Sequence, residues 1–363
     1  MLTTTATELP RLMRCIGSRL MRASVPDNGD TDARDEGNAA DWLAEQLFAG
    51  TPVQVGDKAP NGWAITDDMM DHVRLYLDAL GTGGDMQVVT TFAGETWEVR
   101  GRADHIVYEV DGLSRLTVSD LKYGHRIVSP EENWTLLAHA IGECINKRIQ
   151  PDHVVLRIIQ PRPYHADGPV RSWEVPGGYA GLVERYHAIA ARLSNPTNEL
   201  VSGLDQCAKC HARYDCPAFD RSVWNALDVV MEGFHDAMPN HVLAIEYEQF
   251  EYAEQLIKTK REAVAELMTH RIKSGQVIAG YGLENRQGQR RWAKGLTGAV
   301  LSAATGVGLS LDAVVTPAEA ERRGVDKDVV AALTERPMIG SKLKKVDPDA
   351  MVRRVFQNGG GTR

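Results

Sequence analysis

The spacing of hydrophobic and polar positions predicts helices and strands in a mixed order along this chain. Apolar residues recur at helical spacing in four stretches, which are residues 38–48, 67–80, 179–193 and 222–275. Shorter runs with strand-like composition cover residues 86–92, 96–101, 103–110, 114–124, 153–161 and 170–175. This order is typical of an α/β fold in which helices flank a mixed central sheet.

Local signals mark several boundaries of these elements. Asp111-Gly112 separates two predicted strands and favours a tight hairpin turn. Ser129 and Glu132 have the spacing of a capping box, with Pro130 in the first turn, so we expect a helix to begin there. The first 35 residues are polar and turn-rich, and we expect residues 26–30 to form a loop.

Length and composition bound the domain organisation. The chain has 363 residues, 43% of them hydrophobic, which is enough for one large core domain with an appendage. We expect a core domain over residues 1–220 and a helical extension over 221–300. The region 301–363 has weaker patterning, and its structure stays open at this point.

Charge and the absence of some motifs narrow the function. A net charge of −8 argues against a protein that coats nucleic acid through charge alone. No run approaches the roughly 18 apolar residues of a membrane helix, and the N-terminus lacks a secretory signal pattern. We therefore expect a cytoplasmic protein without a membrane partner. The chain also lacks a P-loop for ATP and a G-x-S-x-G elbow for a serine hydrolase.

The central chemical feature is a pair of carboxylates beside a lysine. The segment G-R-A-D ends at Asp104, and the segment S-D-L-K one hairpin later contains Asp120 and Lys122. Because side chains alternate along a strand, Asp120 and Lys122 point the same way, and the hairpin can bring Asp104 close to both. Two carboxylates, with the Leu121 carbonyl, suit Mg²⁺ or Mn²⁺, and the lysine can stabilise charge on a phosphate. Taken alone, Asp120 and Lys122 also fit an ordinary ion pair at a strand edge.

These segments resemble the core of RecB-type PD-(D/E)XK nucleases. More closely, the sequence is similar to a phage and prophage protein family that carries a domain-of-unknown-function label, over roughly residues 10–300. Further segments of the resemblance are residues 15–18, 36–37, 159–162 and 288–292. The resemblance implies a restriction-endonuclease-like fold and a Mg²⁺- or Mn²⁺-dependent deoxyribonuclease, an exonuclease of phage recombination or DNA processing. It also implies that Asp104 and Asp120 are metal ligands and that Lys122 is the catalytic lysine.

Cysteines form a second candidate site. Cys207-x₂-Cys210-x₅-Cys216 is a tight three-ligand pattern, and Cys15 far upstream can supply a fourth thiolate. Four thiolates suit zinc or an iron–sulfur cluster, and a histidine inside the pattern keeps zinc open. One cysteine before the core and three after it resemble the staple of AddB-type exonucleases, which implies a 4Fe–4S cluster. Cys144 lies on an apolar helix stripe, which is typical of a core residue.

Three positions depart from the family pattern. Asp41 stands on a predicted helix where the family presents a histidine, and a carboxylate can still bind Mg²⁺. Asp41 and Glu45 are equally consistent with two solvated acids on an amphipathic helix. Thr135 and His139 replace a glutamine and a tyrosine, share one helix face, and can still bond phosphate or water.

Basic residues extend the candidate surface for DNA, the expected partner. The candidate phosphate contacts are Arg162, Arg290 and Arg291. Trp292 can stack a base, although such a charged run is more often a solvated face. A helicase or a phage recombination protein is a further candidate partner. The altered positions leave a second interpretation open, a DNA-end-binding or structural protein that keeps the fold and cluster with little catalysis.

Overall fold

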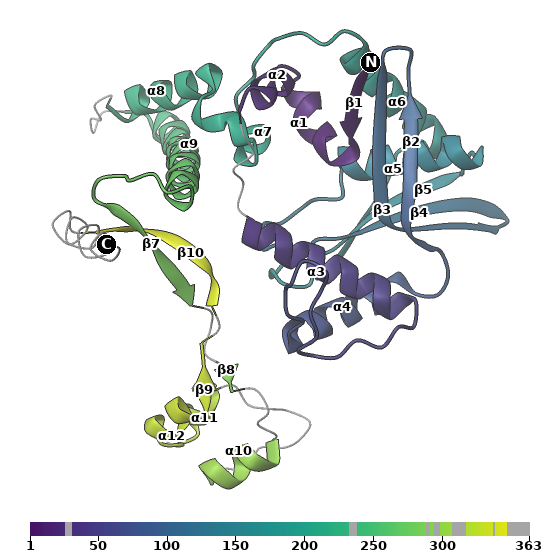
Figure 1. Cartoon of the computed structure of the whole chain (residues 1–363). Coiled ribbons are helices and arrows are strands. Elements are labelled where there is room, and N and C mark those ends of the chain that lie inside the picture. Colours follow the sequence, from purple (N-terminus) through teal and green to yellow (C-terminus); the bar gives the residue numbers. More distant parts are fainter. Residues whose placement is uncertain are drawn as a thin grey trace, which may run out of the picture. The chain divides into compact units, whose positions relative to one another are not determined.

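The chain forms two compact units that divide after Glu266 (Figure 1). The computed structural model describes residues 1–25, 31–231, 238–287, 291–293, 298–306, 317–336 and 338–346. The boundary predicted after residue 220 lies inside the first unit, and the predicted helical extension contributes to both units.

The first unit is built on a six-stranded mixed sheet. Its strands are β1 (Leu2–Thr5), β2 (Asp85–Ala93), β3 (Trp97–Asp111), β4 (Leu113–Leu121), β5 (His153–Ile159) and β6 (Val170–Glu174). The order is β1-β3-β4-β5-β6, and β2 also pairs with β3. β4 and β5 are parallel, whereas β3–β4 and β5–β6 are antiparallel. The predicted mixed central sheet is therefore confirmed.

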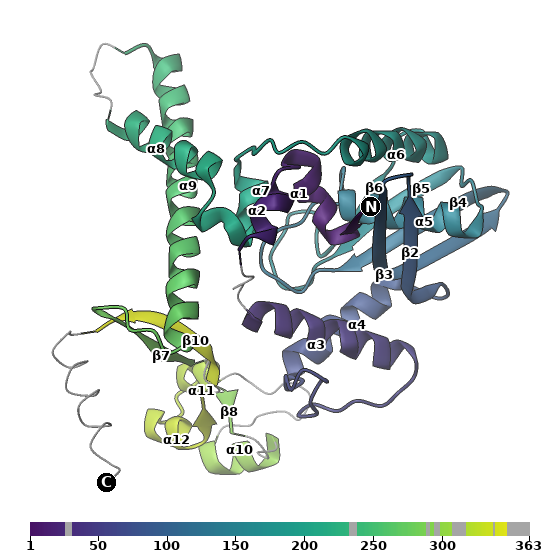
Figure 2. The ribbon, with the colours of Figure 1, turned by 45° about the horizontal axis from the view of Figure 1, so that its top comes forward.

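Helices cover both faces of this sheet (Figures 1 and 2). One hydrophobic cluster joins the sheet to α1 (Leu9–Arg14), α5 (Trp134–Lys147) and α6 (Gly178–Ser194). A second cluster joins it to α3 (Thr31–Phe48) and α4 (Asp67–Leu80). Ile158 belongs to the first cluster and Ile159 to the second, because successive strand residues face opposite sides. A strand buried on both faces needs the continuous apolar run that the sequence has there.

The remaining helices of the first unit surround the cysteine segment. They are α2 (Ser18–Ala23), α7 (Leu204–Ala208), α8 (Pro217–Met231), α9 (Asn240–Lys273) and the short 3₁₀ segments Ala6–Glu8 and His211–Tyr214. A separate apolar cluster contains Cys207 with Phe219 from α8 and Leu256 from α9. The cysteine segment thus packs against α8 and α9 through its own small core.

The second unit contains short strands and helices. β7 (Tyr281–Gln287) pairs antiparallel with β10 (Met338–Lys345), and β8 (Arg291–Trp292) pairs with β9 (Thr334–Glu335). Its other elements are α10 (Gly298–Thr305), α11 (Pro317–Arg322) and α12 (Lys327–Ala332). The buried cluster described there consists of Ala320, Val325 and Val330, so its core is small.

The start of α5 differs from the prediction. Glu132 has φ 46°, which is left-handed, so it cannot occupy the helical position that a capping box requires. Asn133 caps the helix instead, because its side-chain oxygen accepts hydrogen bonds from the N–H groups of Thr135 and Leu136. Ser129 accepts a hydrogen bond from the Glu131 N–H before the helix begins. The capping-box prediction was therefore wrong by a few residues.

Two further predictions were corrected by tertiary pairing. The two strands predicted over 96–101 and 103–110 form one strand, β3, because Gly101 continues the ladder opposite Thr90. The N-terminal segment, for which no element was predicted, contains β1, α1 and α2, and the loop predicted over 26–30 lies outside the described residues. β1 pairs with β3 in parallel, a long-range contact that local composition does not encode.

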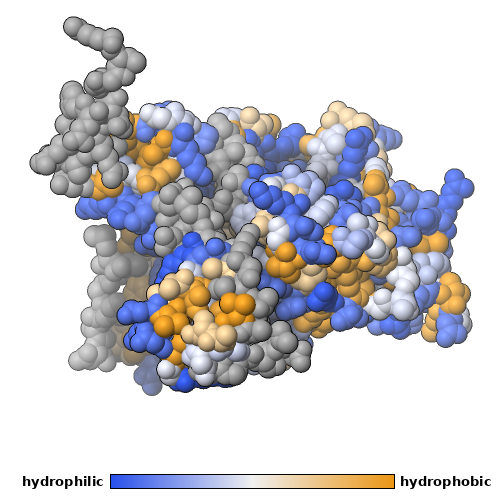
Figure 3. Space-filling view, turned by 60° about the horizontal axis from the view of Figure 1, so that its bottom comes forward, coloured by the Kyte–Doolittle hydropathy of each residue, from blue (hydrophilic) through white to orange (hydrophobic). Residues whose placement is uncertain are grey.

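Apolar side chains also remain on the surface. Figure 3 shows one face of the molecule, on which hydrophobic residues form patches among hydrophilic ones. Large exposed apolar residues occur on unrelated elements, for example Val89 on β2, Trp224 on α8 and Val300 on α10. Such scattered exposure selects no single binding face. None of the helices in the described part of the chain is long and apolar enough to cross a membrane.

Candidate functional site

Asp104 lies where β3 and β4 separate. Regular pairing of these strands ends at His105 and Ser119. At the next residue of β3, the Asp104 carboxylate accepts a hydrogen bond of 2.8 Å from the Leu121 N–H of β4. The side chain thus fills the gap that the strands leave, and it brings a carboxylate to the end of β4. The N–H and C=O of one strand residue point to the same side, so the Leu121 carbonyl also faces β3.

Asp120 and Lys122 point in the same direction at the end of β4. The Lys122 Nζ atom lies 2.5 Å from the buried Oδ2 atom of Asp120. This agrees with strand alternation. The Lys122 side chain as a whole is 36% exposed.

Negative charge exceeds positive charge at this position. Burial raises the pKa of Asp104 well above its usual range, and the charges of Asp120 and Asp41 raise it further. The pKa of Asp41, on α3, is raised to about 7 by burial first and then by Asp120, against the opposing effect of Lys122. Burial lowers the pKa of Lys122, but Asp120 and Asp104 outweigh burial and raise it overall. Three carboxylates around one ammonium favour the entry of a further cation.

The donor atoms of the site are carboxylate oxygens, which suit hard divalent cations. In the described part of the chain, however, no three His, Cys, Asp or Glu side chains are placed as a metal ligand set. Asp120 is paired with Lys122, and Asp104 is bonded to the Leu121 N–H. Each carboxylate therefore already has one contact with a group of the protein itself.

Tyr76 on α4 is a member of this site that the sequence did not reveal. Its side chain is fully buried, and its hydroxyl has no hydrogen-bond partner among the described residues. Burial raises the pKa of Tyr76, and so do the charges of Asp104, Asp120 and Asp41. A buried unpaired hydroxyl is costly, so its place near the carboxylates indicates a polar partner there. Its position on an apolar helix stripe gave no signal in the sequence.

His139 on α5 lies close to the carboxylates but is engaged elsewhere. Its Nδ1 atom is 2.8 Å from the Thr90 hydroxyl, and the residue is 3% exposed. Burial lowers the pKa of His139 to about 4, so the ring is neutral at pH 7. A side chain added at Gly101 would collide with the His139 ring, which explains the glycine of the G-R-A-D segment. Thr135 is partly buried in the first turn of α5.

Arg162 is bound within the protein at the end of β5. It forms a 2.8 Å ion pair with Glu36 and donates a hydrogen bond to the Tyr123 carbonyl. Its guanidinium also lies 4.7 Å from the centre of the Tyr123 ring. The Tyr123 hydroxyl in turn lies 3.4 Å from the Nδ1 atom of His72. Arg162 therefore braces the residue that follows Lys122.

Gln160 is a second residue that the sequence did not single out for a role. Its buried amide donates hydrogen bonds of 2.8 Å to the carbonyls of Gly124 and Arg126. Its side-chain oxygen accepts hydrogen bonds from the Val128 N–H and from Arg171. One side chain thus fixes the loop that follows β4. In the sequence, Gln160 stood out only as part of the resembling segment 159–162 at the end of an apolar strand, with no role assigned.

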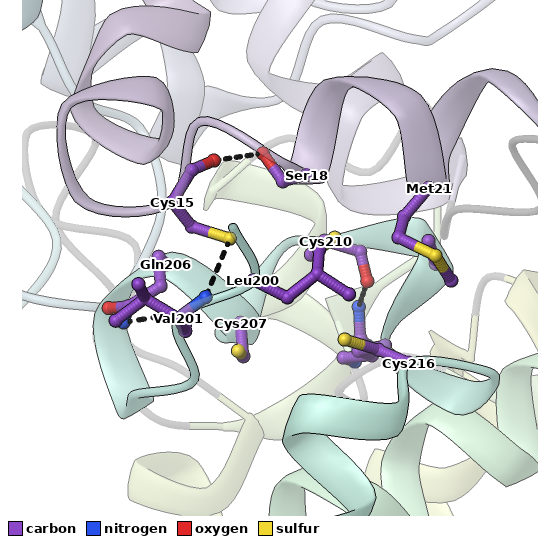
Figure 4. Close-up of a pocket in the computed structure, with 11 residues that line it drawn as sticks. Cys15, Ser18, Met21, Leu200, Val201, Gln206, Cys207, Cys210 and Cys216 are labelled. Atoms are coloured by element: carbon purple, nitrogen blue, oxygen red, sulfur yellow. Dashed lines mark hydrogen bonds between the residues drawn. The ribbon is translucent and has the colours of Figure 1, made fainter. Parts of the chain in front are cut away.

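The four cysteines of the predicted cluster line one pocket (Figure 4). Cys15 follows α1, whereas Cys207, Cys210 and Cys216 belong to the segment around α7. All four are free thiols, and three of them are buried. Leu200 lines the same pocket, and its side chain lies between the cysteines in this view. In the described part of the chain, these thiols do not yet form a metal ligand set.

Backbone contacts bring Cys15 to this pocket. The Gly17 N–H donates to the Glu199 carbonyl, and a side chain at Gly17 would lie 2.4 Å from that oxygen. Only glycine permits so close an approach of the two segments. Two residues after Glu199, the Val201 N–H donates to the Cys15 sulfur at 3.3 Å.

Charged and polar groups surround the thiols. Burial raises the pKa of Cys207 to about 11, against a hydrogen bond from the Gly203 backbone that lowers it. Burial also raises the pKa of Cys210, while the Ala212 backbone, Arg11 and Arg22 lower it. Burial thus favours the protonated thiols, and the backbone N–H groups and arginines partly offset it toward the thiolate forms that bind metals.

Ion pairs connect the cysteine segment to the carboxylate site and to α9. Asp205 on α7 is paired with Arg14 of α1 and, at 3.1 Å, with Arg126 of the loop after β4. Arg213 donates two hydrogen bonds, of 2.6 and 2.7 Å, to the Glu266 carboxylate on α9. Such bidentate pairs fix orientation as well as distance. The cysteine segment is therefore held on both sides.

Two predicted DNA contacts are not placed. Arg290 lies outside the described residues. Arg291 is described by its backbone in β8 of the second unit, where Trp292 packs against the small core.

Comparisons with known proteins give one extended match. The family model described as "Protein of unknown function (DUF2800)" matches residues 5–322. No curated protein matches the chain. A solved structure described as "Crystal structure of SSO0001" aligns at 15% identity over 60% of this chain and 87% of that chain. Its TM-score of 0.29 is too low to carry an argument about the fold. Because the family match extends over most of the sequence, the chain belongs to the DUF2800 family.

Proposed function

We propose that this protein is a metal-dependent DNA nuclease of the PD-(D/E)XK type, with an exonuclease activity in phage recombination or DNA processing. The observation that carries the proposal is the convergence of Asp104, in the middle of β3, with Asp120 and Lys122 at the end of β4. An ordinary surface ion pair does not gather an excess of buried carboxylate around a single ammonium group.

The donor set fits a divalent cation. Asp104, Asp120 and the Leu121 carbonyl offer hard oxygen ligands, and Asp41 offers a fourth. The raised pKa values of Asp104 and Asp41 mean that their ionised forms are destabilised, and a bound cation would stabilise these forms. A bound Mg²⁺ or Mn²⁺ would polarise a phosphoryl oxygen and lower the pKa of a water.

Lys122 has two tasks in this proposal. Its ammonium group lies against the Asp120 carboxylate and neutralises it. With substrate present, its ammonium donates hydrogen bonds to the scissile phosphate or orients the attacking water, which stabilises the charge that grows in the transition state. Asp104 stays in position because the Leu121 N–H holds its carboxylate. The Tyr76 hydroxyl, which has no hydrogen-bond partner among the described residues, would donate a hydrogen bond to a metal-bound water at the same site.

We further propose that Cys15, Cys207, Cys210 and Cys216 hold a 4Fe–4S cluster, with zinc as the alternative. Four thiols at one pocket and backbone N–H donors toward the sulfurs support this assignment. Closing the long segment between Cys15 and Cys207 stabilises the folded state by restricting the unfolded chain. The cluster then staples the start of the nuclease core to the helices that follow it.

A second candidate function is a DNA-end-binding or structural protein with the same fold and little catalysis. The buried His139, bonded to Thr90, favours this alternative, because it cannot contact phosphate where the family pattern has a tyrosine. The intact Asp104, Asp120 and Lys122 favour the nuclease.

The test is cleavage of end-labelled single- and double-stranded DNA by anaerobically purified protein with Mg²⁺ or Mn²⁺. We expect metal-dependent cleavage that Asp120→Asn abolishes. Asp111→Asn is the matched control, since it makes the same change at the far, exposed end of the same hairpin. DNA binding without cleavage by the folded, brown wild-type protein would favour the second function instead.

A further inference from the structure

We propose that Lys209 is a phosphate-binding residue, which the cysteine segment holds beside the carboxylate site so that it contacts the nucleic-acid backbone next to the bond that is cut. The inference rests on the proposed nuclease function and deepens it, because it assigns part of the substrate path to the cysteine segment.

A continuous set of contacts leads from the carboxylate site to Lys209. The loop after Lys122 is fixed by Gln160, which bonds the carbonyl of Arg126 at 2.8 Å. The Arg126 side chain then reaches Asp205 on α7, at 3.1 Å. Lys209 follows Asp205 by four residues at the end of this short helix, so the two side chains project from the same side.

Lys209 differs from its cationic neighbours in having no carboxylate partner among the described residues. Lys122 is paired with Asp120, and Arg14 and Arg126 share Asp205. Lys209 keeps a solvent-accessible surface, but burial lowers its pKa, and the positive charges of Lys122 and Arg126 lower it further. Neighbouring cations repel each other unless an anion lies between them. A phosphate of the DNA backbone is an anion that the unpaired Lys209 can bind.

The position of Lys209 depends on the cysteines. Cys207 and Cys210 flank it, and the Cys210 N–H bonds the Cys207 carbonyl at 3.1 Å across it. Any group that binds these thiols therefore also fixes the backbone of Lys209. This gives the cysteine site a role in substrate binding in addition to stability, because loss of the bound group would release a phosphate contact.

The test measures DNA affinity without cleavage. Fluorescein-labelled oligonucleotides, single- and double-stranded, are titrated with full-length protein in Ca²⁺, and the salt dependence of Kd is recorded. We expect Lys209→Gln to raise Kd about fivefold to tenfold and to reduce the salt slope by roughly 0.7–0.9, the value of one phosphate contact. Lys209→Arg should retain most of the affinity. The matched control is Lys147→Gln, an exposed lysine at the opposite end of α5 from the site.

The outcomes separate this inference from the proposed function. If the wild-type protein binds and cleaves DNA while Lys209→Gln shows the wild-type Kd and salt slope, Lys209 is not a phosphate contact and the nuclease assignment stands. An equal loss of DNA affinity in Lys209→Gln and Lys147→Gln would mean that only the net charge of the protein matters, and it would also overturn the inference. A wild-type protein that neither binds nor cleaves DNA would overturn both.

Discussion

The carboxylate site and the cysteine pocket are assembled in different ways. Asp104 and Lys122 lie on adjacent strands joined by a tight turn, so strand register alone brings them together. The cysteine pocket joins segments that are far apart, since Val201, which bonds the Cys15 sulfur, lies 186 residues from it. The first site needs a favourable charge balance, whereas the second must offset the entropy of closing a long loop. This explains why ion pairs and close backbone contacts surround the cysteines.

The two sites also differ in the charged groups around their acidic side chains. At the first site, burial raises the pKa of Asp104, and the charges of Asp120 and Asp41 raise it further. At the second site, burial raises the pKa of Cys210, whereas the Ala212 backbone, Arg11 and Arg22 oppose this rise. The comparison predicts that the first site controls chemistry and the second controls stability and placement. Changes in the two sites should therefore have separable effects.

The largest expected effect belongs to the carboxylate site. Lys122→Ala should reduce the initial rate of DNA cleavage by a factor of about 10² to 10³, the usual result of removing one group that stabilises transition-state charge. The measurement is a single-turnover assay with saturating Mg²⁺. Lys147→Ala, remote from the site, should cleave at the wild-type rate. An active Lys122→Ala protein would move the chemistry away from β4.

A substitution in the cysteine pocket should change the stability of the protein and its visible absorbance. Cys216→Ala should lose its visible absorbance and bound iron, and should unfold with a free energy lower by about 3 kcal/mol, as expected for opening a long closed loop. Iron analysis and thermal unfolding under anaerobic conditions measure both. The Cys144→Ala protein should keep its iron, because Cys144 lies on α5 in the hydrophobic core of the sheet and not in the cysteine pocket. A colourless wild-type protein that contains zinc would contradict the 4Fe–4S assignment.

A smaller effect concerns the pH dependence of stability, which should reflect the raised pKa of Asp41 at the carboxylate site. The pKa of Asp41 is about 7 in the folded protein and near 4 when unfolded. Between these values the unfolded chain has released a proton that the folded protein retains, so stability falls as pH rises through this range and stays lowered above it. Asp41→Asn removes this penalty.

The gain from Asp41→Asn should therefore depend on pH. In the presence of a chelator the variant should be more stable than the wild type by about 2 kcal/mol at pH 8, and the difference should vanish toward pH 4. Chemical unfolding at several pH values measures it, with Asp111→Asn as the control that shows no such trend. A gain that is the same at every pH would mean that Asp41 does not carry the raised pKa.

Much of the fold was predictable because its signals are local. The helix 67–80 and the strands on both sides of Asp111-Gly112 occur where periodicity and turn residues placed them. β1 was missed because its partner, β3, lies more than ninety residues away, as the pairing of Leu2 with Trp97 shows. Pattern analysis does not sense such pairings.

The candidate site was predictable in part for the same reason. Strand alternation correctly placed Asp120 beside Lys122, and hairpin distance brought Asp104 near them. Tyr76 and Gln160 were not found, because an apolar helix stripe and a strand end give no chemical signal. Their roles follow from burial and from hydrogen bonds, which exist only in the folded chain.

The smallest predicted effect concerns the helix that supports the carboxylate site. Asn133 caps α5 by accepting hydrogen bonds from two backbone N–H groups, and α5 carries Thr135 and His139. Asn133→Ala should lower the free energy of unfolding by about 1 kcal/mol, whereas Asn133→Ser should retain most of it. Thermal unfolding measures this loss of stability. The iron content should not change, because no residue of α5 lines the cysteine pocket. A loss of iron in Asn133→Ala would mean that the two sites are coupled through α5, and their separation would fail.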